Sequence, residues 1–367
     1  MGTHHEQPQG AVVNVSVCDV GFKDNYKGIH TYLALCICCV GTITNILNMV
    51  ILTRREMINS TNSILTGLAV SDFLLLLEYL IYVSTYLRGD EHLWESYWHS
   101  VFVLFHAHFS QITHTISICL TVTLAVWRYI AICKPHLNLI LCTLPRARCA
   151  VIMAYIISPI ICVPNYFMYS IHQFPESSSN TSLYQVKLSS YSDMEVFQKI
   201  HFWLHSVVVK ILPCILLTVL IFNIIRAMYV AKRRKVNLIK MGTPSMESVE
   251  RKIPRMEKLT QKTTKMLLTV LFMFLITELP QGILVLITAI YGHSFLEDCY
   301  NQWGEVMDLL ALINATVNFL LYCIMSHQFR FTFKHLCQPP KQQNLSPKWG
   351  PDTGSAQAAT SGKPSQD

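Results

Sequence analysis

Long apolar runs alternate with short polar stretches along most of the chain. An α-helix that crosses a bilayer core of about 30 Å needs roughly 20 mostly apolar residues. Seven runs reach this length, and the fifth and sixth continue beyond it. They are Tyr32–Thr53, Ile64–Leu87, Trp98–Cys133, Cys149–Ile171, Ile200–Val230, Thr263–Tyr291 and Val306–Met325. The pattern predicts an all-α membrane protein, a bundle of seven transmembrane helices within residues 29–326.

An amphipathic segment, residues 327–337, follows the last run. Aromatic side chains share one of its faces and Arg330 and Lys334 share the other. This pattern predicts a short helix that lies in the membrane interface. Cys337 at its end is either a palmitoylation site or a plain thiol. Residues 338–367 are rich in Pro, Gly, Ser and Gln, so we expect a disordered cytoplasmic tail.

The distribution of charge predicts the orientation. Charged residues make up 14% of the chain and apolar residues 51%, and the net charge is +7. Basic residues flank the runs on one side, at Arg54, Arg148 and Lys232–Lys235. Cytoplasmic loops carry such an excess, so we expect a multi-pass plasma membrane protein whose residues 1–28 are extracellular. Basic clusters beside apolar runs argue against a nucleic-acid partner.

Two of the five acceptor sequons for N-glycosylation agree with this topology, and the other three, at Asn59, Asn314 and Asn344, fall inside the cell or in the membrane. The sequons at Asn14 and Asn180 fall in segments expected outside the membrane. Most of the 13 cysteines lie inside apolar runs, where a thiol behaves as a small hydrophobe. The cysteines do not form the two closely spaced pairs of a zinc site.

Several polar residues interrupt the apolar runs. Asp72 lies in the second run, Ser117 in the third, and Asn314 and Asn318 lie one helical turn apart in the seventh. An ionised carboxylate at mid-membrane costs about 2.5–3.5 kcal/mol, so these groups must face other helices, water or a ligand. The sequence leaves open whether they form a hydrogen-bonded core or bind an ion.

Further motifs lie near the helix ends. The third run ends in Trp127-Arg128-Tyr129, the sixth contains Thr277-Glu278-Leu279-Pro280, and the seventh contains Asn318-Phe319-Leu-Leu-Tyr322. These strings resemble those of the rhodopsin-like (class A) G-protein-coupled receptors, over all seven helices. With His114–Ile132 and Phe274–Leu284, they are most similar to invertebrate neuropeptide receptors for myosuppressin, FMRFamide-like, sex-peptide and myoinhibitory peptides.

The resemblance implies roles for the residues at the inner helix ends. Arg128, Tyr129 and Tyr322 are expected to contact a heterotrimeric G protein in the active state. Trp127 replaces the usual acidic residue, so Arg128 lacks its adjacent counter-ion and basal activity is expected to be possible. Phenylalanine replaces the usual proline at position 319, which removes a source of kinking.

The resemblance also implies a sodium ion in the polar core of the resting state. The positions matching Asp72, Ser117, Asn314 and Asn318 line the family's sodium pocket, and hard oxygen ligands suit that ion. The alternative is a polar core without sodium. No other metal and no cofactor are expected.

Departures from the family narrow the ligand class. Ser110 stands where amine receptors carry an aspartate, and Leu312 stands where opsins carry the retinal-binding lysine. The family's usual disulfide between the third helix and the second outer loop is missing. Cys18 and Cys299 are the two cysteines expected outside, either joined to each other or as two free thiols.

The expected function is that of a receptor for a short amidated neuropeptide, signalling through an inhibitory-class G protein. An Arg-Phe-amide ligand would need an acid for its guanidinium and aromatic walls for its ring. The candidate acids are Glu78, Glu278, Glu305 and Asp308. The candidate lining residues are Tyr79, Tyr82, His106, Phe109, Ser110, Gln111, His114, Trp203 and Gln281.

Three alternatives to this ligand assignment remain open on the sequence alone. A Trp-amide ligand would use the acids differently, a non-peptide ligand would replace the peptide, and a constitutively active receptor would need none. The chain contains no nucleophile–base pair or phosphate-binding loop that would indicate an enzyme.

Overall fold

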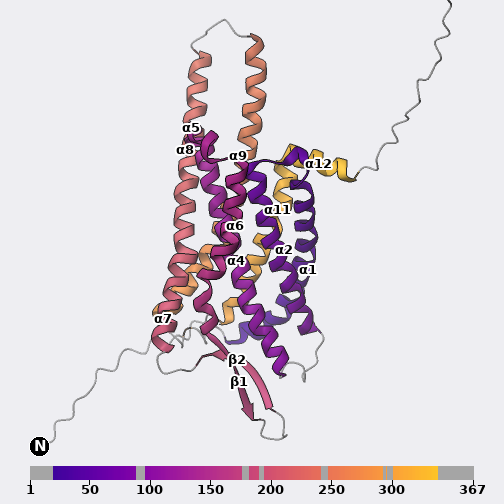
Figure 1. The fold of residues 1–367 in the computed structure, drawn as a ribbon, viewed down its shortest axis with the longest axis vertical. Coiled ribbons are helices and arrows are strands. Elements are labelled where there is room, and N and C mark those ends of the chain that lie inside the picture. Colours follow the sequence, from indigo (N-terminus) through magenta and orange to yellow (C-terminus); the bar gives the residue numbers. More distant parts are fainter. Residues whose placement is uncertain are drawn as a thin grey trace, which may run out of the picture.

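The chain forms an elongated helical bundle (Figure 1). The computed structural model describes residues 20–87, 96–175, 182–189, 194–240, 247–291, 295 and 301–337. Within these ranges, seven helices are long and apolar enough to cross a membrane, which confirms the predicted seven-helix architecture. Five of the spans are single helices or parts of them, namely α1 (Val20–Leu52), α2 (Ser60–Leu87), α4 (Tyr97–Cys133), α9 (Glu247–Tyr291) and α11 (Asn301–Met325).

The two ends of the bundle differ in the short elements that they carry. One end carries the antiparallel pair β1 (Tyr169–Pro175) and β2 (Ser182–Leu188), and we call it the hairpin end. The other carries α12 (His327–Cys337) and α5 (Pro135–Leu141), and we call it the α12 end. A turn of 3-10 helix, η1 (Arg55–Met57), joins α1 to α2.

The fifth span consists of three consecutive helical segments. They are α7 (Met194–Leu204), the π-helical turn η3 (His205–Ile211) and α8 (Leu212–Lys240). A π-helical turn changes the direction of the side chains that follow it, and such turns are frequent at functional sites. At the α12 end, α8 and the start of α9 project beyond the bundle (Figure 1), as expected from the length of their apolar runs.

The fourth span ends earlier than predicted. We expected a helix to Ile171, but α6 covers Leu144–Ile161 and a 3-10 turn, η2 (Val163–Phe167), follows it. Pro159 and Pro164 lack the N–H that continues a helix. Residue 171 lies in β1 opposite Val186. The β-hairpin was not predicted, although apolar and polar residues alternate along most of β2.

Close packing holds the first helix against its neighbours. The first helix α1 contacts both α2 and α11. At Gly41, a Cβ atom would come within 2.8 Å of Leu76 and closer still to Thr316, so glycine permits this approach. Asn45 donates to the backbone oxygen of Ala315 over 2.9 Å.

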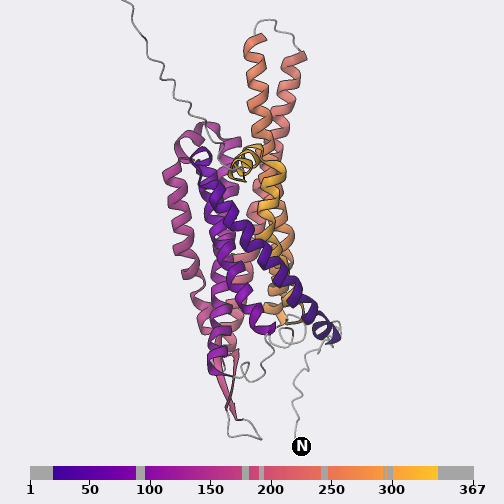
Figure 2. The same cartoon turned by 90° about the vertical axis from the view of Figure 1, so that its right-hand side faces the viewer.

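The amphipathic helix α12 lies across the end of the bundle (Figures 1 and 2). Phe329 is buried against Tyr322, with ring centroids 5.5 Å apart. Phe319 packs edge-on against Phe329 and Phe333, each at 5.8 Å. The phenylalanine that replaces the family's proline therefore belongs to an aromatic cluster that joins α11 to α12.

Candidate functional site

A polar cavity of about 70 Å³ lies in the half of the bundle nearer the hairpin end. Residues of α2, α4, α9 and α11 line it, and they include seven of the predicted ligand-binding residues. These are Tyr79, His106, Ser110, Gln111, His114, Gln281 and Asp308. This volume holds a few water molecules, at about 10–15 Å³ each by this measure, so only one end of a ligand can enter without widening the cavity.

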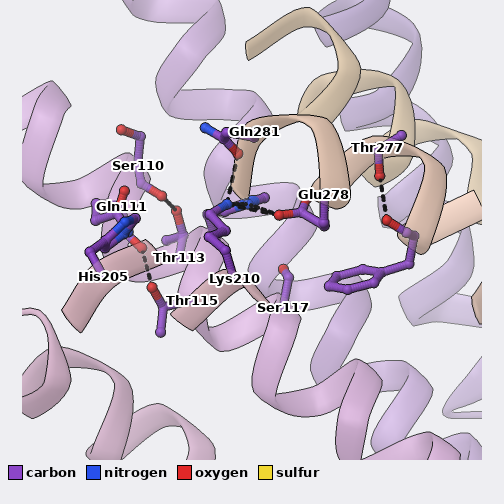
Figure 3. A network of polar contacts seen from close by, with 12 residues as sticks. Ser110, Gln111, Thr113, Thr115, Ser117, His205, Lys210, Thr277, Glu278 and Gln281 are labelled. Atoms are coloured by element: carbon purple, nitrogen blue, oxygen red, sulfur yellow. Dashed lines mark hydrogen bonds and ion pairs between the residues drawn. The ribbon is translucent and has the colours of Figure 1, made fainter. Parts of the chain in front are cut away.

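A buried ionic network (Figure 3) borders the cavity through His114 and Gln281. Lys210, from η3, donates from Nζ to Oε2 of Glu278 over 2.8 Å and to Oε1 of Gln281 over 2.7 Å. Its Nζ also lies 2.7 Å from Nε2 of His114, which itself lies 3.0 Å from Oε2 of Glu278. The network therefore connects α4, η3 and α9 through side chains.

Burial makes this network strongly interdependent. The Lys210 and Glu278 residues are each 1% exposed. The second carboxylate oxygen of Glu278, Oε1, is buried and has no hydrogen-bond partner in the described part of the chain. A buried charge that loses its partner is costly, so this pair holds the three helices in one arrangement.

A second cluster of polar and aromatic side chains borders the cavity through Tyr79 and His106. Nδ1 of His106 lies 2.7 Å and 2.9 Å from the two carboxylate oxygens of Glu78. The ring of Tyr82 stacks on His106 with the centroids 3.7 Å apart and the planes nearly parallel. The hydroxyl of Tyr79 hydrogen-bonds to the buried His30 over 3.1 Å. Glu78 is thus bonded inside the protein, although we predicted it as a ligand-binding acid.

Three predicted ligand-binding residues neither line the cavity nor belong to the two clusters beside it. Trp203 lies on α7 with 46% of its surface exposed. Phe109 stacks on the exposed ring of Phe105. Glu305 is half-buried on α11 and interacts with other groups. The structure therefore gives these three residues no direct place in the polar cavity.

Lys210 was missed by the sequence analysis, although the sequence carries its signal. It is a lysine inside an apolar run, and ionisable residues within the membrane usually mark functional sites. His205 was missed as well, and its ring hydrogen-bonds to the side chain of Gln111.

The predicted polar core forms around Asp72. Ser117 donates to Oδ1 of Asp72 over 2.8 Å, and Nδ2 of Asn318 donates to Oδ2 over 3.0 Å. Asn314 is half-buried one turn away, and no hydrogen bond joins it to Asp72. The Oδ1 atom of Asn318 is buried and has no partner among the described residues. Three of the four predicted residues are therefore in direct contact.

The predicted coupling residues lie toward the α12 end. Arg128 is half-buried, and it forms no ion pair with a described carboxylate. Its Nε has no hydrogen-bond partner within the same set of residues. Burial raises the pKa of the nearby Cys142 thiol, and Arg128 acts in the opposite direction. Tyr322 is buried and Tyr129 is half-buried.

Some predicted modification sites lie beyond what the structure describes. Asn14, Cys18, Asn180 and Cys299 fall outside the described residues. Cys337 is the last residue of α12, which is the predicted place for a lipid anchor at the end of an interfacial helix.

Comparisons with known proteins agree with the seven-helix architecture. The family described as the serpentine-type 7TM GPCR chemoreceptor Srw matches residues 32–338. The G-protein coupled receptor dmsr-1 of Caenorhabditis elegans is 30% identical over 360 residues, covering 87% of this chain and 70% of that protein. The sex peptide receptor of Drosophila melanogaster is 27% identical, covering 80% of this chain and 69% of its own. The FMRFamide receptor of the same fly is also 27% identical, covering 80% and 51%.

Proposed function

This chain belongs to the serpentine seven-helix G-protein-coupled receptors, and we propose that its ligand is a short peptide with an amidated C-terminus. It is therefore a multi-pass plasma membrane receptor rather than an enzyme. The names of the similar fly receptors support the peptide class, because they refer to sex peptide and FMRFamide.

The residues that line the cavity are the observation that supports an amidated ligand. Carboxamide and hydroxyl groups of Gln111, Gln281 and Ser110 line it and can exchange hydrogen bonds with a neutral amide. The carboxylate of Asp308 lines the same cavity and would repel a free C-terminal carboxylate placed beside it. The rings of Tyr79 and His106 offer an aromatic surface to an aromatic side chain.

A G-protein dissociation assay in cells that express the full chain tests this proposal. The receptor is challenged with peptides ending in Arg-Phe-amide or Trp-amide and with the same peptides as free acids. We expect a response that requires the amide. An equal response to the free acids would contradict amidation, and silence at confirmed surface expression would favour a non-peptide ligand.

The α12 end supports a second proposal, which concerns coupling and basal activity. Arg128, Tyr129 and Tyr322 would contact the G protein, for which the resemblance favours the inhibitory class. Arg128 forms no ion pair with a carboxylate of the described residues, and this favours signalling without ligand. The same assay without peptide measures this directly, and pertussis toxin should abolish the signal if the inhibitory class carries it.

We further propose that the polar core binds a sodium ion. Oδ1 of Asn318 is a buried, unpartnered oxygen on the residue that donates to Asp72, so the donor set fits a hard cation. Asp72, Ser117 and Asn318 would hold it, with Asn314 one turn away. The ion would neutralise the buried carboxylate in the resting state. Agonist affinity should then fall with sodium concentration in the wild-type receptor and not in Asp72→Asn.

The proposed topology places the hairpin end outside the cell. Basic side chains at the α12 end support it, including Arg54, Arg148 and Arg330. Residues 1–28 would be extracellular and 338–367 cytoplasmic. Asn14 and Asn180 would then carry glycans, Cys18 and Cys299 would be free to pair, and Cys337 would face the lipid-modifying enzymes. Removal of both sequons should abolish the mobility shift on glycosidase treatment.

A further inference from the structure

The charges around the cavity are unequally matched. Two of the candidate acids are bonded within the protein, since Glu278 is paired with Lys210 and His114, and Glu78 is paired with His106. Asp308 lines the cavity, its side chain is exposed there, and no described group forms a hydrogen bond or an ion pair with it. One carboxylate of the cavity is therefore left without a direct partner.

No lysine or arginine of the described residues bonds directly to Asp308. Among the cavity-lining residues and their hydrogen-bond partners in the described ranges, Lys210 is the single lysine or arginine. All three of its described polar contacts are already made, to His114, Glu278 and Gln281. An ammonium group has three donors, so Lys210 has none left for Asp308.

We propose that Asp308 binds a positively charged group of the peptide ligand, a guanidinium or an ammonium, and thereby selects cationic peptides. This inference rests on the proposed function and narrows its ligand class. An unpaired carboxylate gains most from a charged donor, and a guanidinium matches it with two parallel hydrogen bonds. The ligand would supply a positive charge that bonds directly to Asp308.

The small cavity limits how a peptide can place that group. About 70 Å³ admits one side chain or chain terminus without rearrangement. The rest of the ligand would lie toward the hairpin end. A positive charge within a residue or two of the inserted end would reach Asp308, whereas a distant one would not.

Paired peptides and receptor variants test the assignment in the full-length receptor. The probes are an amidated tetrapeptide ending in Arg-Phe, its analogue with citrulline in place of arginine, and the N-acetylated form of each. The receptors are wild type, Asp308→Asn and Asp308→Glu, with Glu305→Gln as the matched control on the same helix. G-protein dissociation gives the potency, and surface labelling confirms equal expression.

We expect wild type to prefer the arginine peptide over the citrulline peptide by about 10- to 100-fold, the range for a charge-assisted bond. Asp308→Asn should remove this preference, Asp308→Glu should retain much of it, and Glu305→Gln should leave it unchanged. If N-acetylation has the larger effect instead, the bound cation is the peptide's terminal ammonium, and Asp308→Asn should remove that effect.

Two results would overturn the inference, and they are distinguishable. If amidated peptides act on wild type but Asp308→Asn changes neither preference, Asp308 is not the cation site and the peptide proposal stands. If wild type at confirmed surface density ignores every amidated peptide, the peptide proposal fails and the role of Asp308 fails with it.

Discussion

The two halves of the bundle hold their charged residues in different ways. In the half nearer the hairpin end, Lys210, Glu278 and His114 bond to one another across three helical segments. In the half nearer the α12 end, Arg128 has no described acidic partner, and aromatic and aliphatic packing holds the helices. Paired charges fix a geometry, whereas an unpaired arginine is available to a partner. The ligand would thus bind in the half nearer the hairpin end, and the G protein would couple to the half nearer the α12 end.

Among the substitutions considered, loss of Lys210 should destabilise the receptor most. Lys210→Met leaves Glu278 buried without its cation, and breaking such a pair costs about 3–5 kcal/mol. We expect little receptor at the cell surface, measured by flow cytometry. The double variant Lys210→Met/Glu278→Leu should recover much of the expression, because no uncompensated charge remains. Normal expression of the single variant would show that Glu278 does not depend on this partner.

Removal of an aromatic ring should weaken the α12 half less. Phe319→Ala deletes the ring that packs on Phe329 and Phe333. Because Phe319 is only half-buried, we expect a loss of about 2 kcal/mol, below the range for fully buried rings. Thermal inactivation of the solubilised receptor measures it. Leu320→Ala, at a position that is 56% exposed, is the matched control and should change little.

A counter-ion next to Arg128 should give the half nearer the α12 end a paired charge, as in the other half. Trp127→Glu restores an adjacent acid, and a gain of about 1 kcal/mol for the resting state would lower ligand-free signalling by about fivefold. The measurement is basal G-protein dissociation at matched surface density. Trp127→Phe separates the loss of the indole from the gain of charge. Equal signalling by both variants would contradict a role for the missing counter-ion.

The smallest expected effect concerns the second cluster beside the cavity. Tyr82→Leu removes the ring that stacks on His106 at 3.7 Å. Aromatic pairs contribute about 0.5–1.5 kcal/mol beyond burial, so peptide potency should fall by about threefold as His106 gains freedom. Trp98→Leu, at an exposed aromatic on α4, is the comparison. A larger loss would indicate direct contact between Tyr82 and the peptide.

The long apolar runs were the part of the sequence that predicted the fold best. All seven spans were predicted because about 20 apolar residues in succession have one stable form in a bilayer. In the fourth span, α6 ends at Ile161, ten residues before the predicted Ile171, and Pro164 follows without the N–H that would continue the helix. The β-hairpin was missed because two strands of 7 residues give a weak local signal beside such runs.

The sequence predicted many of the residues at the candidate site but not which of them bond to one another. From the sequence we predicted four candidate acids without deciding which of them is free to bind a ligand, and we did not predict Lys210. That decision needed the contacts, because a carboxylate bonded to lysine or histidine differs from a free one only in its surroundings. Trp203 was chosen for its residue type, yet it is 46% exposed and is not among the residues that line the cavity.

The sequence by itself determined the number of spans, the amphipathic α12 and the residues that stand at Asp72, Arg128 and Glu278. These follow from the solvation of one segment or from one residue's identity. Only the tertiary structure decided that Lys210 pairs with Glu278, that His106 pairs with Glu78, and that Asp308 has no bonded partner among the described residues. Charge pairing between helices depends on distances of about 3 Å between residues far apart in the chain, and electrostatic energy changes steeply with such distances.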